Sequence, residues 1–583
     1  MKSFFKNVLA NIVAIFLVFF AGFFFFVMMM IIGSIGGDNI KVRDKSILTL
    51  TQNTNITDSP LESQPDFLFG DNSVSNVMAY DIVEAIKKAK SDDKIQGISI
   101  ESDFINAGII QLSEVRNALE DFKKSGKFVY AYGNNVSQSS YFLSSVADQY
   151  FLNPVGIVEL KGLSTEVGYL KDLMDKYGVG VQVLRHGKYK SAVETYMRSS
   201  ISEENKEQLS TLLNDLWGEM SAKISKSRKM SQNQLNLVAD SLYGMLTENN
   251  IEHRLVDRLI HKSQYDELLR KKLNLKEKDK LNKISFAKYT ESFKEEHSSD
   301  EEVAVLYASG AIYNGKGYDG IYADTFIKEI KELKDNEDVK AVVLRINSPG
   351  GSANASEEIL NELQLLKAKK PLVVSFGDYA ASGGYYIAMA GEKIYSEPMT
   401  LTGSIGVFGV LFNVKDIANR NGFHTDVVST NANANYYSIF QGLSPHGEKM
   451  MSKSIEQTYS TFVNHVMKNR KMTFEQVDNL GGGRVWSGIR AKENGLVDEL
   501  GSLNDAIAYA SKKAGLKKHS VKSYPAEMSY IEQLMKDFQS EEDLEMKLVK
   551  KKLGKDHYML FKTLTNTSAE NRIMMQTPYT IKY

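Results

Sequence analysis

The sequence of 583 residues contains no cysteine. This absence excludes thiol nucleophiles, disulfide bonds and zinc sites built on thiolates. Neither sign of charge is in excess, because 71 basic residues face 72 acidic ones, so we expect no nucleic-acid partner. The three glycines at 481–483 lack the Lys-Ser or Lys-Thr of a phosphate-binding loop, and we interpret them as a plain turn. We expect no cofactor and no metal.

The N-terminus carries a long apolar run over residues 8–32. The run is longer than the core of a signal peptide and long enough to span a bilayer. Lys2 and Lys6 precede it without an acidic residue, which favours a cytoplasmic amino end and a main body outside. We therefore predict an uncleaved transmembrane helix. The alternative is a cleaved signal peptide, for which the small residues at 33–36 offer a site.

Beyond this segment, strand-like apolar runs alternate with helical patterns, which is typical of α/β domains. Changes in composition predict five segments. In order they are a cytoplasmic end with the transmembrane anchor (1–37), a polar tether (38–65), a first α/β repeat with a helical extension and a linker (66–300), a second α/β repeat (301–515) and a helical C-terminal extension (516–583).

The two α/β regions are copies of one unit. Shifted by 244 positions, residues 94–178 align with the second half of the chain without a gap. Positions that favour special backbone or packing then coincide: Gly133 with Gly377, Tyr141 with Tyr385, Pro154 with Pro398, and Gly162 with Gly406. The fold class we expect is therefore α/β, a tandem duplication of one domain with added helices and an N-terminal transmembrane helix.

One stretch of the second copy has what acyl transfer needs. A buried strand over 339–346 runs into the glycine turn Gly350–Gly351, and a second strand over 371–376 leads to Ser382 at the start of a helix. The backbone N–H groups of a helix start are unpaired and electropositive. Ser382 therefore has the setting of a nucleophile with donors for an oxyanion nearby.

The repeat comparison shows that each copy holds half of a site. Gln138 lies opposite Ser382, and residues 106–107 (Asn-Ala) lie opposite the glycine turn, so the first copy lacks the nucleophile and the turn. In return, the first copy has Lys190 where the second has Ala434.

Two kinds of side chain are candidates for the general base. A histidine would make a Ser/His/Asp triad, and His186, His424 and His446 are available. Lys188 and Lys190 are the other candidates, since a lysine buried against apolar residues loses its proton more easily. The small residues after Lys190 favour an inward position for it, so the residues favour Ser/Lys over Ser/His.

Four motifs together resemble the signal peptide peptidase A family of serine peptidases, in its long, duplicated, membrane-anchored (protease IV-type) form. They are Asn-Ser-Pro-Gly-Gly at 347–351, Ala-Ser-Gly-Gly-Tyr-Tyr at 381–386, Thr-Gly-Ser-Ile-Gly-Val at 402–407 and Gly-Lys-Tyr-Lys-Ser-Ala at 187–192. The resemblance implies a crotonase/ClpP-like fold. It also implies that Ser382 is the nucleophile and Lys190 the base, with the N–H groups of Gly350 or Gly351 and of Gly383 as the oxyanion hole.

Residues around these motifs are expected to support them. Arg345 and Asn347 lead into the glycine turn, and we expect them to hold its shape. Ser404 is either a hydrogen-bond partner of the lysine amine or a turn serine. We interpret Tyr385 and Tyr386 as packing residues.

The predicted function is that of a membrane-anchored serine endopeptidase acting on short apolar peptides, which bind by main-chain pairing to strand edges. The resemblance implies that these peptides are cleaved signal peptides, that the chain forms a homotetramer, and that it sits in the bacterial inner membrane with its catalytic domain on the periplasmic side. Two alternatives are a non-catalytic membrane scaffold that binds apolar segments and a crotonase-like acyl-CoA enzyme. Neither gives both the serine and the lysine a role.

Overall fold

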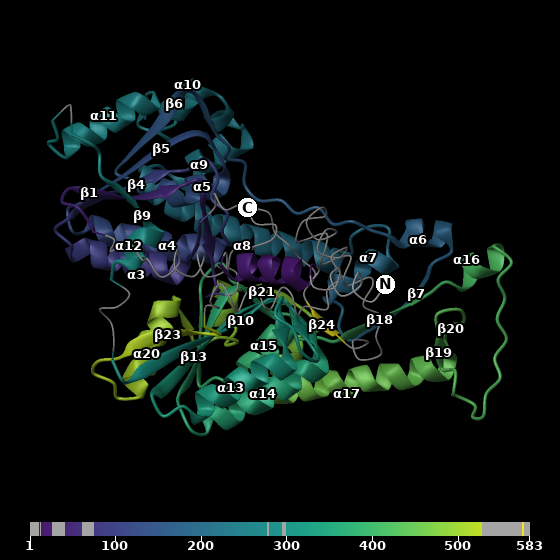
Figure 1. Ribbon diagram of the computed structural model, residues 1–583. Helices are drawn as coiled ribbons and strands as arrows, with labels where there is room; N and C mark the ends of the chain where they lie inside the picture. Colours follow the sequence, from purple (N-terminus) through teal and green to yellow (C-terminus); the bar gives the residue numbers. More distant parts are fainter. Residues whose placement is uncertain are drawn as a thin grey trace.

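The computed structural model describes residues 11, 13–25, 41–60, 75–276, 279–293, 299–526 and 574–576. Two α/β bodies lie one above the other in Figure 1, the first repeat in purple to teal and the second in green and yellow. Each body has its own sheet with helices packed on it, and a smaller sheet runs between them.

The first repeat has a parallel sheet of order β8-β6-β5-β4-β1-β9. The strands of this repeat, of which β2 and β3 lie outside that sheet, are β1 (Ser46–Thr51), β2 (Thr54–Thr57), β3 (Ser75–Met78), β4 (Ile95–Glu101), β5 (Phe128–Val136), β6 (Gln149–Val158), β8 (Arg258–Leu259) and β9 (Lys283–Ser285). Its helices are α3 (Ala79–Ser91), α4 (Ile109–Lys123), α5 (Gln138–Ser144), α8 (Glu203–Arg228), α9 (Gln232–Asp240), α10 (Thr247–Glu252), α11 (Lys262–Lys272) and α12 (Phe286–Glu291).

The second repeat has the sheet order β21-β17-β15-β13-β10-β23, with β16 beside β15 and β22 beside β16. Its strands are β10 (Glu302–Ser309), β13 (Val339–Ser348), β15 (Leu372–Ala381), β16 (Lys393–Ser396), β17 (Leu401–Gly403), β21 (Val485–Ser487), β22 (Glu499–Leu500) and β23 (Ser520–Tyr524). Its helices are α13 (Ala323–Asp335), α14 (Ala353–Lys367), α15 (Gly383–Ala388), α17 (Pro445–Arg470), α18 (Phe474–Leu480), α19 (Gly488–Glu493) and α20 (Leu503–Lys513).

The predicted duplication is confirmed. Helices α3 and α4 have counterparts of identical length in α13 and α14, each displaced by the same 244 positions found in the sequence. The apolar run of β13 packs on both faces, as expected of a buried parallel strand. Val342 and Leu344 enter the core cluster on one side, and Ala341 and Val343 enter the cluster on the other.

The smaller sheet brings the two repeats together. Its order is β12 (Ile321–Tyr322), β11 (Ile312–Tyr313), β14 (Gly350–Ser352), β24 (Met574–Gln576), β18 (Phe408–Asn413) and β7 (Gly180–Arg185). Strand β7 of the first repeat pairs antiparallel with β18 of the second over six residue pairs. This pairing carries the segment after β7 to the second repeat. In Figure 1 the two strands extend away from the main sheets toward α6 (Lys171–Tyr177) and α16 (Lys415–Arg420).

Two predicted connecting segments, the tether and the linker, contain regular secondary structure, and the predicted C-terminal extension contains strands. The tether predicted over 38–65 contains β1 and β2, and β1 is a buried strand between β4 and β9. The threonines of β1 give it a polar composition. Ile47 and Leu48 are nevertheless fully buried, and Thr49 donates its hydroxyl hydrogen to the carbonyl of Ile284. The linker predicted at the end of the first repeat contains β9 and α12, and the C-terminal extension contains the strands β23 and β24. The rest of that extension, which was predicted to be helical, lies outside the described residues.

The predicted membrane anchor lies partly outside the described residues. Within it, residue 11 and residues 13–25 are helical, and their apolar side chains are exposed. Among the described residues, no helix combines the length and the apolar character that a membrane span requires.

Candidate active site

Ser382 lies at the carboxyl end of β15 and forms the N-cap of α15. Its backbone has φ 56° and ψ −115°, a strained conformation for a residue with a side chain. The N–H of Ser382 donates to the carbonyl of Gly403 at 2.8 Å, which fixes the turn. The serine is fully buried in this structure. The local sequence favours this turn because the small residues Ala381 and Gly383 flank the serine.

Lys190 reaches Ser382 from the other repeat. Its Nζ lies 2.7 Å from Ser382 Oγ, 3.0 Å from Ser404 Oγ and 3.1 Å from the Ser404 carbonyl oxygen. The lysine side chain is 1 % exposed. This burial lowers the pKa of the Lys190 ammonium well below its ordinary value. The structure therefore brings together the three polar side chains that the sequence singled out, on segments 192 and 214 residues apart.

The glycine turn faces Ser382 from β14. Gly350 has φ 99° and donates its N–H to Ser348 Oγ at 3.2 Å. The amide nitrogen of Gly351 lies close to Gly383, only 3.1 Å from where a Cβ on Gly383 would stand. The two chain segments thus approach each other at a distance that only glycine allows.

A strand from the C-terminal extension lies beside the same turn. Strand β24 pairs antiparallel with β14 and with β18, so it bridges the glycine turn and the strand that follows Ser404. Met575 within it is fully buried, and its carbonyl oxygen lies next to Gly350. Nothing in the composition of the tail pointed to this position.

The other candidates for the base lie elsewhere. Lys188 is exposed and lies over the ring of Tyr189. His186 pairs with Glu456 at 2.8 Å, and His424 contacts Asn419 at 3.1 Å. His446 lies in the first turn of α17. Ser382 has its side-chain hydrogen bond with Lys190 instead.

Arg345 does not hold the glycine turn, contrary to our expectation. It is buried and reaches the first repeat, with its guanidinium 2.7 Å from Asp58 and 3.2 Å from Glu114. Asn347 accepts the N–H of Tyr379 at 3.1 Å and so connects β13 with β15. No sequence pattern predicted this ion pair, because Asp58 lies in the segment that was predicted to be a tether.

Both tyrosines after the serine are buried in the core, as expected of packing residues. Tyr385 donates its hydroxyl hydrogen to the carbonyl of Leu496 at 2.7 Å, and Tyr386 hydrogen-bonds to Glu357. Among the described residues, no group of histidine and carboxylate side chains has the arrangement of a metal site.

The comparison with known proteins decides the family. A family profile described as "Peptidase family S49" matches residues 121–276 and again residues 364–517, one match in each repeat. The chain belongs to peptidase family S49. The first match contains Lys190 and the second contains Ser382. A second profile, "Clp protease", matches residues 294–402 and includes the glycine turn, in agreement with the expected ClpP-like fold.

Similar proteins carry names consistent with this assignment. "Protease 4" of Salmonella typhi is 39 % identical over 466 residues, covering 78 % of this chain and 75 % of that protein. "Serine protease SPPA, chloroplastic" of Arabidopsis thaliana is 31 % identical and covers 82 % of this chain and 70 % of its own length. "Putative signal peptide peptidase SppA" of Enterococcus faecium is 32 % identical and covers 42 % of this chain and 73 % of its own. The chain is a serine peptidase of this family.

Proposed function

We propose that this S49 peptidase cleaves peptide bonds with a dyad of Ser382 and Lys190, one residue from each repeat. The observation that carries the proposal is the 2.7 Å contact between Lys190 Nζ and Ser382 Oγ, both of which are buried. Burial favours the neutral amine, and a neutral lysine is a base.

The contacts of Lys190 suit a neutral amine. Such an amine has two hydrogens and one lone pair. The carbonyl oxygen and the hydroxyl oxygen of Ser404 can accept the two hydrogens, and the Ser404 hydroxyl in turn donates to the carbonyl of Gly483 at 3.3 Å. The lone pair is then directed at the hydroxyl hydrogen of Ser382. Ser404 thereby orients the base.

The reaction follows from this arrangement. Lys190 takes the proton of Ser382 while Oγ attacks the peptide carbonyl carbon, and the resulting ammonium gives the proton to the leaving amine. The N–H groups of Gly351 and Gly383 would stabilise the oxyanion. Water then attacks the acyl-enzyme, with Lys190 again as the base. Removal of one such oxyanion donor typically costs about 3–4 kcal/mol of transition-state stabilisation.

The substrate we propose is a short, extended, apolar peptide, with cleaved signal peptides as the physiological source. Strand β24 supports this mode of binding, because it already pairs as an extended backbone between β14 and β18. A peptide in the same position would place a carbonyl beside Gly350, where that of Met575 lies. The Enterococcus faecium relative named as a putative signal peptide peptidase supports the choice of substrate class.

Membrane attachment and assembly are further parts of the proposal. The apolar run at 8–32 with its preceding lysines supports a single membrane span with the protease domain on the periplasmic side of a bacterial inner membrane. The arm formed by α6, α16 and the following loop exposes Tyr177, Phe423 and Val428, the last of them completely. Such exposed apolar side chains support an interface between copies of the chain, which we propose to be a homotetramer.

The test of this function is cleavage of an apolar reporter peptide by the purified full-length protein and by Ser382→Ala. We expect cleavage by the native protein and background rates from the variant, together with labelling of Ser382 alone by a serine-directed phosphonate. Melting curves of both proteins control for folding. A variant that retains most of the native rate would show that the nucleophile is another residue.

Gly350→Ala is expected to lower kcat/KM by about 100- to 1,000-fold, the usual loss on disabling one oxyanion donor. A Cβ at this position would stand 2.0 Å from the Met575 carbonyl oxygen and 2.6 Å from the Gly383 amide nitrogen, so it would block the space in front of that donor. The matched control is Gly315→Ala, which also has a positive φ but has no atom within 4 Å of the new Cβ. Equal losses in the two variants would assign the effect to backbone strain.

A further inference from the structure

The three glycines at 481–483 lie directly against the loop that carries Lys190. The N–H of Tyr189 donates to the carbonyl of Gly482 at 3.0 Å. A Cβ on Gly483 would stand 2.6 Å from the N, Cα and Cβ atoms of Lys190, and a Cβ on Gly187 would stand 2.3 Å from the backbone of Gly482. These segments belong to different repeats, and their backbones meet without side chains between them.

The same turn also contacts the partner of the lysine amine. The N–H of Gly483 donates to the carbonyl of Ile405 at 2.8 Å, and the carbonyl of Gly483 accepts the hydroxyl hydrogen of Ser404. The turn is therefore bonded to the backbone before Lys190 on one side and to Ser404 on the other. Its role is more than that of the plain turn we expected.

We propose that the Gly481–Gly483 turn is the seat that positions Lys190 against Ser382, and that Tyr459 braces this seat from α17. The inference rests on the proposed Ser/Lys dyad. It assigns Gly483 and Tyr459 as positioning residues of the dyad, because neither touches Ser382.

Tyr459 connects the turn to α18 and to the loop that carries Lys190. Its hydroxyl accepts the N–H of Gly482 at 3.4 Å and hydrogen-bonds to Asp478 on α18. Its ring stacks on His186, with the centroids 3.7 Å apart. His186 pairs in turn with Glu456, one turn earlier on α17, and its backbone N–H donates to the carbonyl of Val407. The second repeat therefore contacts the loop before Lys190 at two positions, His186 and Tyr189.

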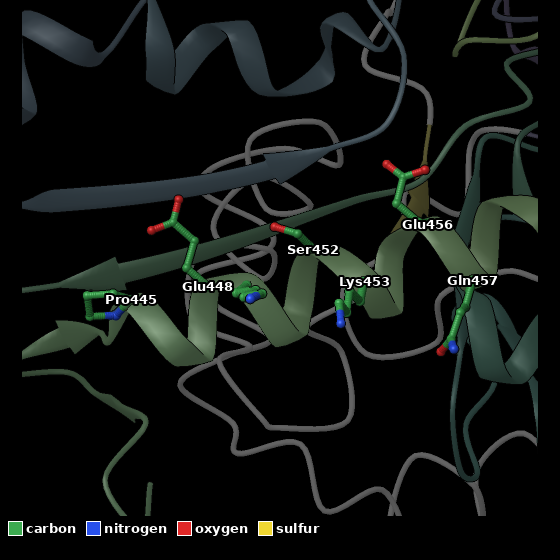
Figure 2. Close-up of a pocket in the computed structure, with 7 residues that line it drawn as sticks. Pro445, Glu448, Ser452, Lys453, Glu456 and Gln457 are labelled. Atoms are coloured by element: carbon green, nitrogen blue, oxygen red, sulfur yellow. The ribbon is translucent and has the colours of Figure 1, made fainter. Parts of the chain in front are cut away.

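Figure 2 shows where Glu456 lies relative to the polar face of α17. Its carboxylate projects on the same side of the helix as Glu448 and Ser452, toward strands of the smaller sheet. These residues line an open hollow of about 720 Å³ that includes neither Ser382 nor Lys190. Glu456 contacts His186, and the hollow is separate from the proposed dyad.

A loosened seat would change the lysine in a way that a general loss of structure would not. Lys190 loses its proton readily because it is kept from water, so water entering around a displaced loop raises its pKa again. The charged groups that surround the loop are Arg185 and Glu194 on its own repeat and Glu456, Asp478 and Arg484 on the other. They remain in place in the variants below.

The experiment compares pH–rate profiles of Gly483→Ala and Tyr459→Phe with those of the native full-length protein on an apolar reporter peptide. We expect kcat to fall about 100-fold in Gly483→Ala, the loss that a displacement of about 1 Å can cause. Tyr459→Phe keeps the stacking but loses the hydroxyl, and we expect a fall of about tenfold. In both variants KM stays unchanged and the acidic limb of the profile moves to higher pH, so that part of the rate returns at alkaline pH.

The matched control is Gly515→Ala, which has a similar φ (74° against 84°) and no atom within 4 Å of the new Cβ. It should keep the native kcat and profile. If Gly483→Ala and Tyr459→Phe keep the native acidic limb, the seat is overturned, whatever their rates. If Ser382→Ala or Lys190→Met remains active, the dyad itself is wrong, and so is the proposed role of the Gly481–Gly483 turn. Should Gly483→Ala not fold, Tyr459→Phe alone decides.

Discussion

Lys190→Met is expected to lower kcat/KM on an apolar reporter peptide by about 100- to 10,000-fold, the usual contribution of a general base. Methionine fills the site of the lysine stem without strain but has no basic nitrogen. Lys190→Arg should be as inactive, because a guanidinium stays protonated in proteins and cannot accept the proton of Ser382. The chain should remain folded in both cases.

The proposed dyad also predicts the pH dependence of the native enzyme. Lys190 is a base only when neutral, and its pKa is lowered well below the ordinary value by burial. The neutral fraction rises as the pH increases through this lowered pKa. We therefore expect kcat/KM to rise with pH and to reach its plateau well below the pH at which a free lysine titrates. A Ser/His site would instead follow an ordinary imidazole, near pH 6.5.

Lys188→Met is the matched control for these variants. Lys188 lies two positions earlier on the same loop, is exposed and contacts Tyr189 rather than the serine. It should keep the native rate and the native acidic limb. If Lys190→Met kept a substantial rate, or kept the acidic limb of the native pH–rate profile, the base would be a histidine and not Lys190.

Much of this site was predictable because its signals are local. Ser382 was recognisable from a strand, a glycine-flanked turn and a helix start within a dozen residues. The location of Lys190 on the other copy came from comparing the two repeats, since the comparison showed what each copy lacks. The candidate bases differ in position: Lys190 Nζ lies 2.7 Å from Ser382 Oγ, whereas His186 contacts Glu456.

The features that were missed all depend on contacts between distant segments. The sequence of β1 resembles a polar tether, and only its pairing with β4 and β9 identifies it as a strand. Strand β24 is only three residues long, and the sequence of the tail did not single it out. The glycines at 481–483 have no phosphate-loop signature, and their purpose is visible only beside the lysine loop. Arg345 and Asp58 are 287 positions apart. Periodicity and turn chemistry describe neighbours along the chain and carry no information about such pairs.

The ion pair between Arg345 and Asp58 joins the two repeats, each of which carries one residue of the proposed dyad. Arg345 on β13 contacts Asp58 and Glu114, and Glu114 also accepts the N–H of Leu503 at the start of α20. Asp378 on β15 accepts the N–H of Ile110 at the start of α4. Burial opposes the charge on Arg345, but the carboxylates of Asp58 and Glu114 outweigh it and raise the pKa of the guanidinium. The interface between the repeats thus contains a buried cation surrounded by acidic groups.

Arg345→Met is expected to lower the free energy of unfolding by about 3–5 kcal/mol, the usual cost of leaving a buried charge without its partner. Chemical denaturation of the full-length protein measures the loss. The matched control is Arg490→Met, which also breaks an arginine–carboxylate contact between the repeats, at 2.6 Å from Asp215, but with an arginine side chain that is 41 % exposed. We expect less than about 1 kcal/mol from that contact, because its arginine is exposed to solvent.

The loss in Arg345→Met should grow with pH. Burial already raises the pKa of Glu114, and that of Asp378 to about 6, while Arg345 lowers both. Without the arginine these folded-state pKa values rise further above their unfolded values, so the folded chain holds more protons and loses stability as the pH increases through them. The variant should therefore be closer to the native protein at pH 5 than at pH 8. A loss independent of pH would mean that packing of the arginine stem, and not its charge, holds the two repeats together.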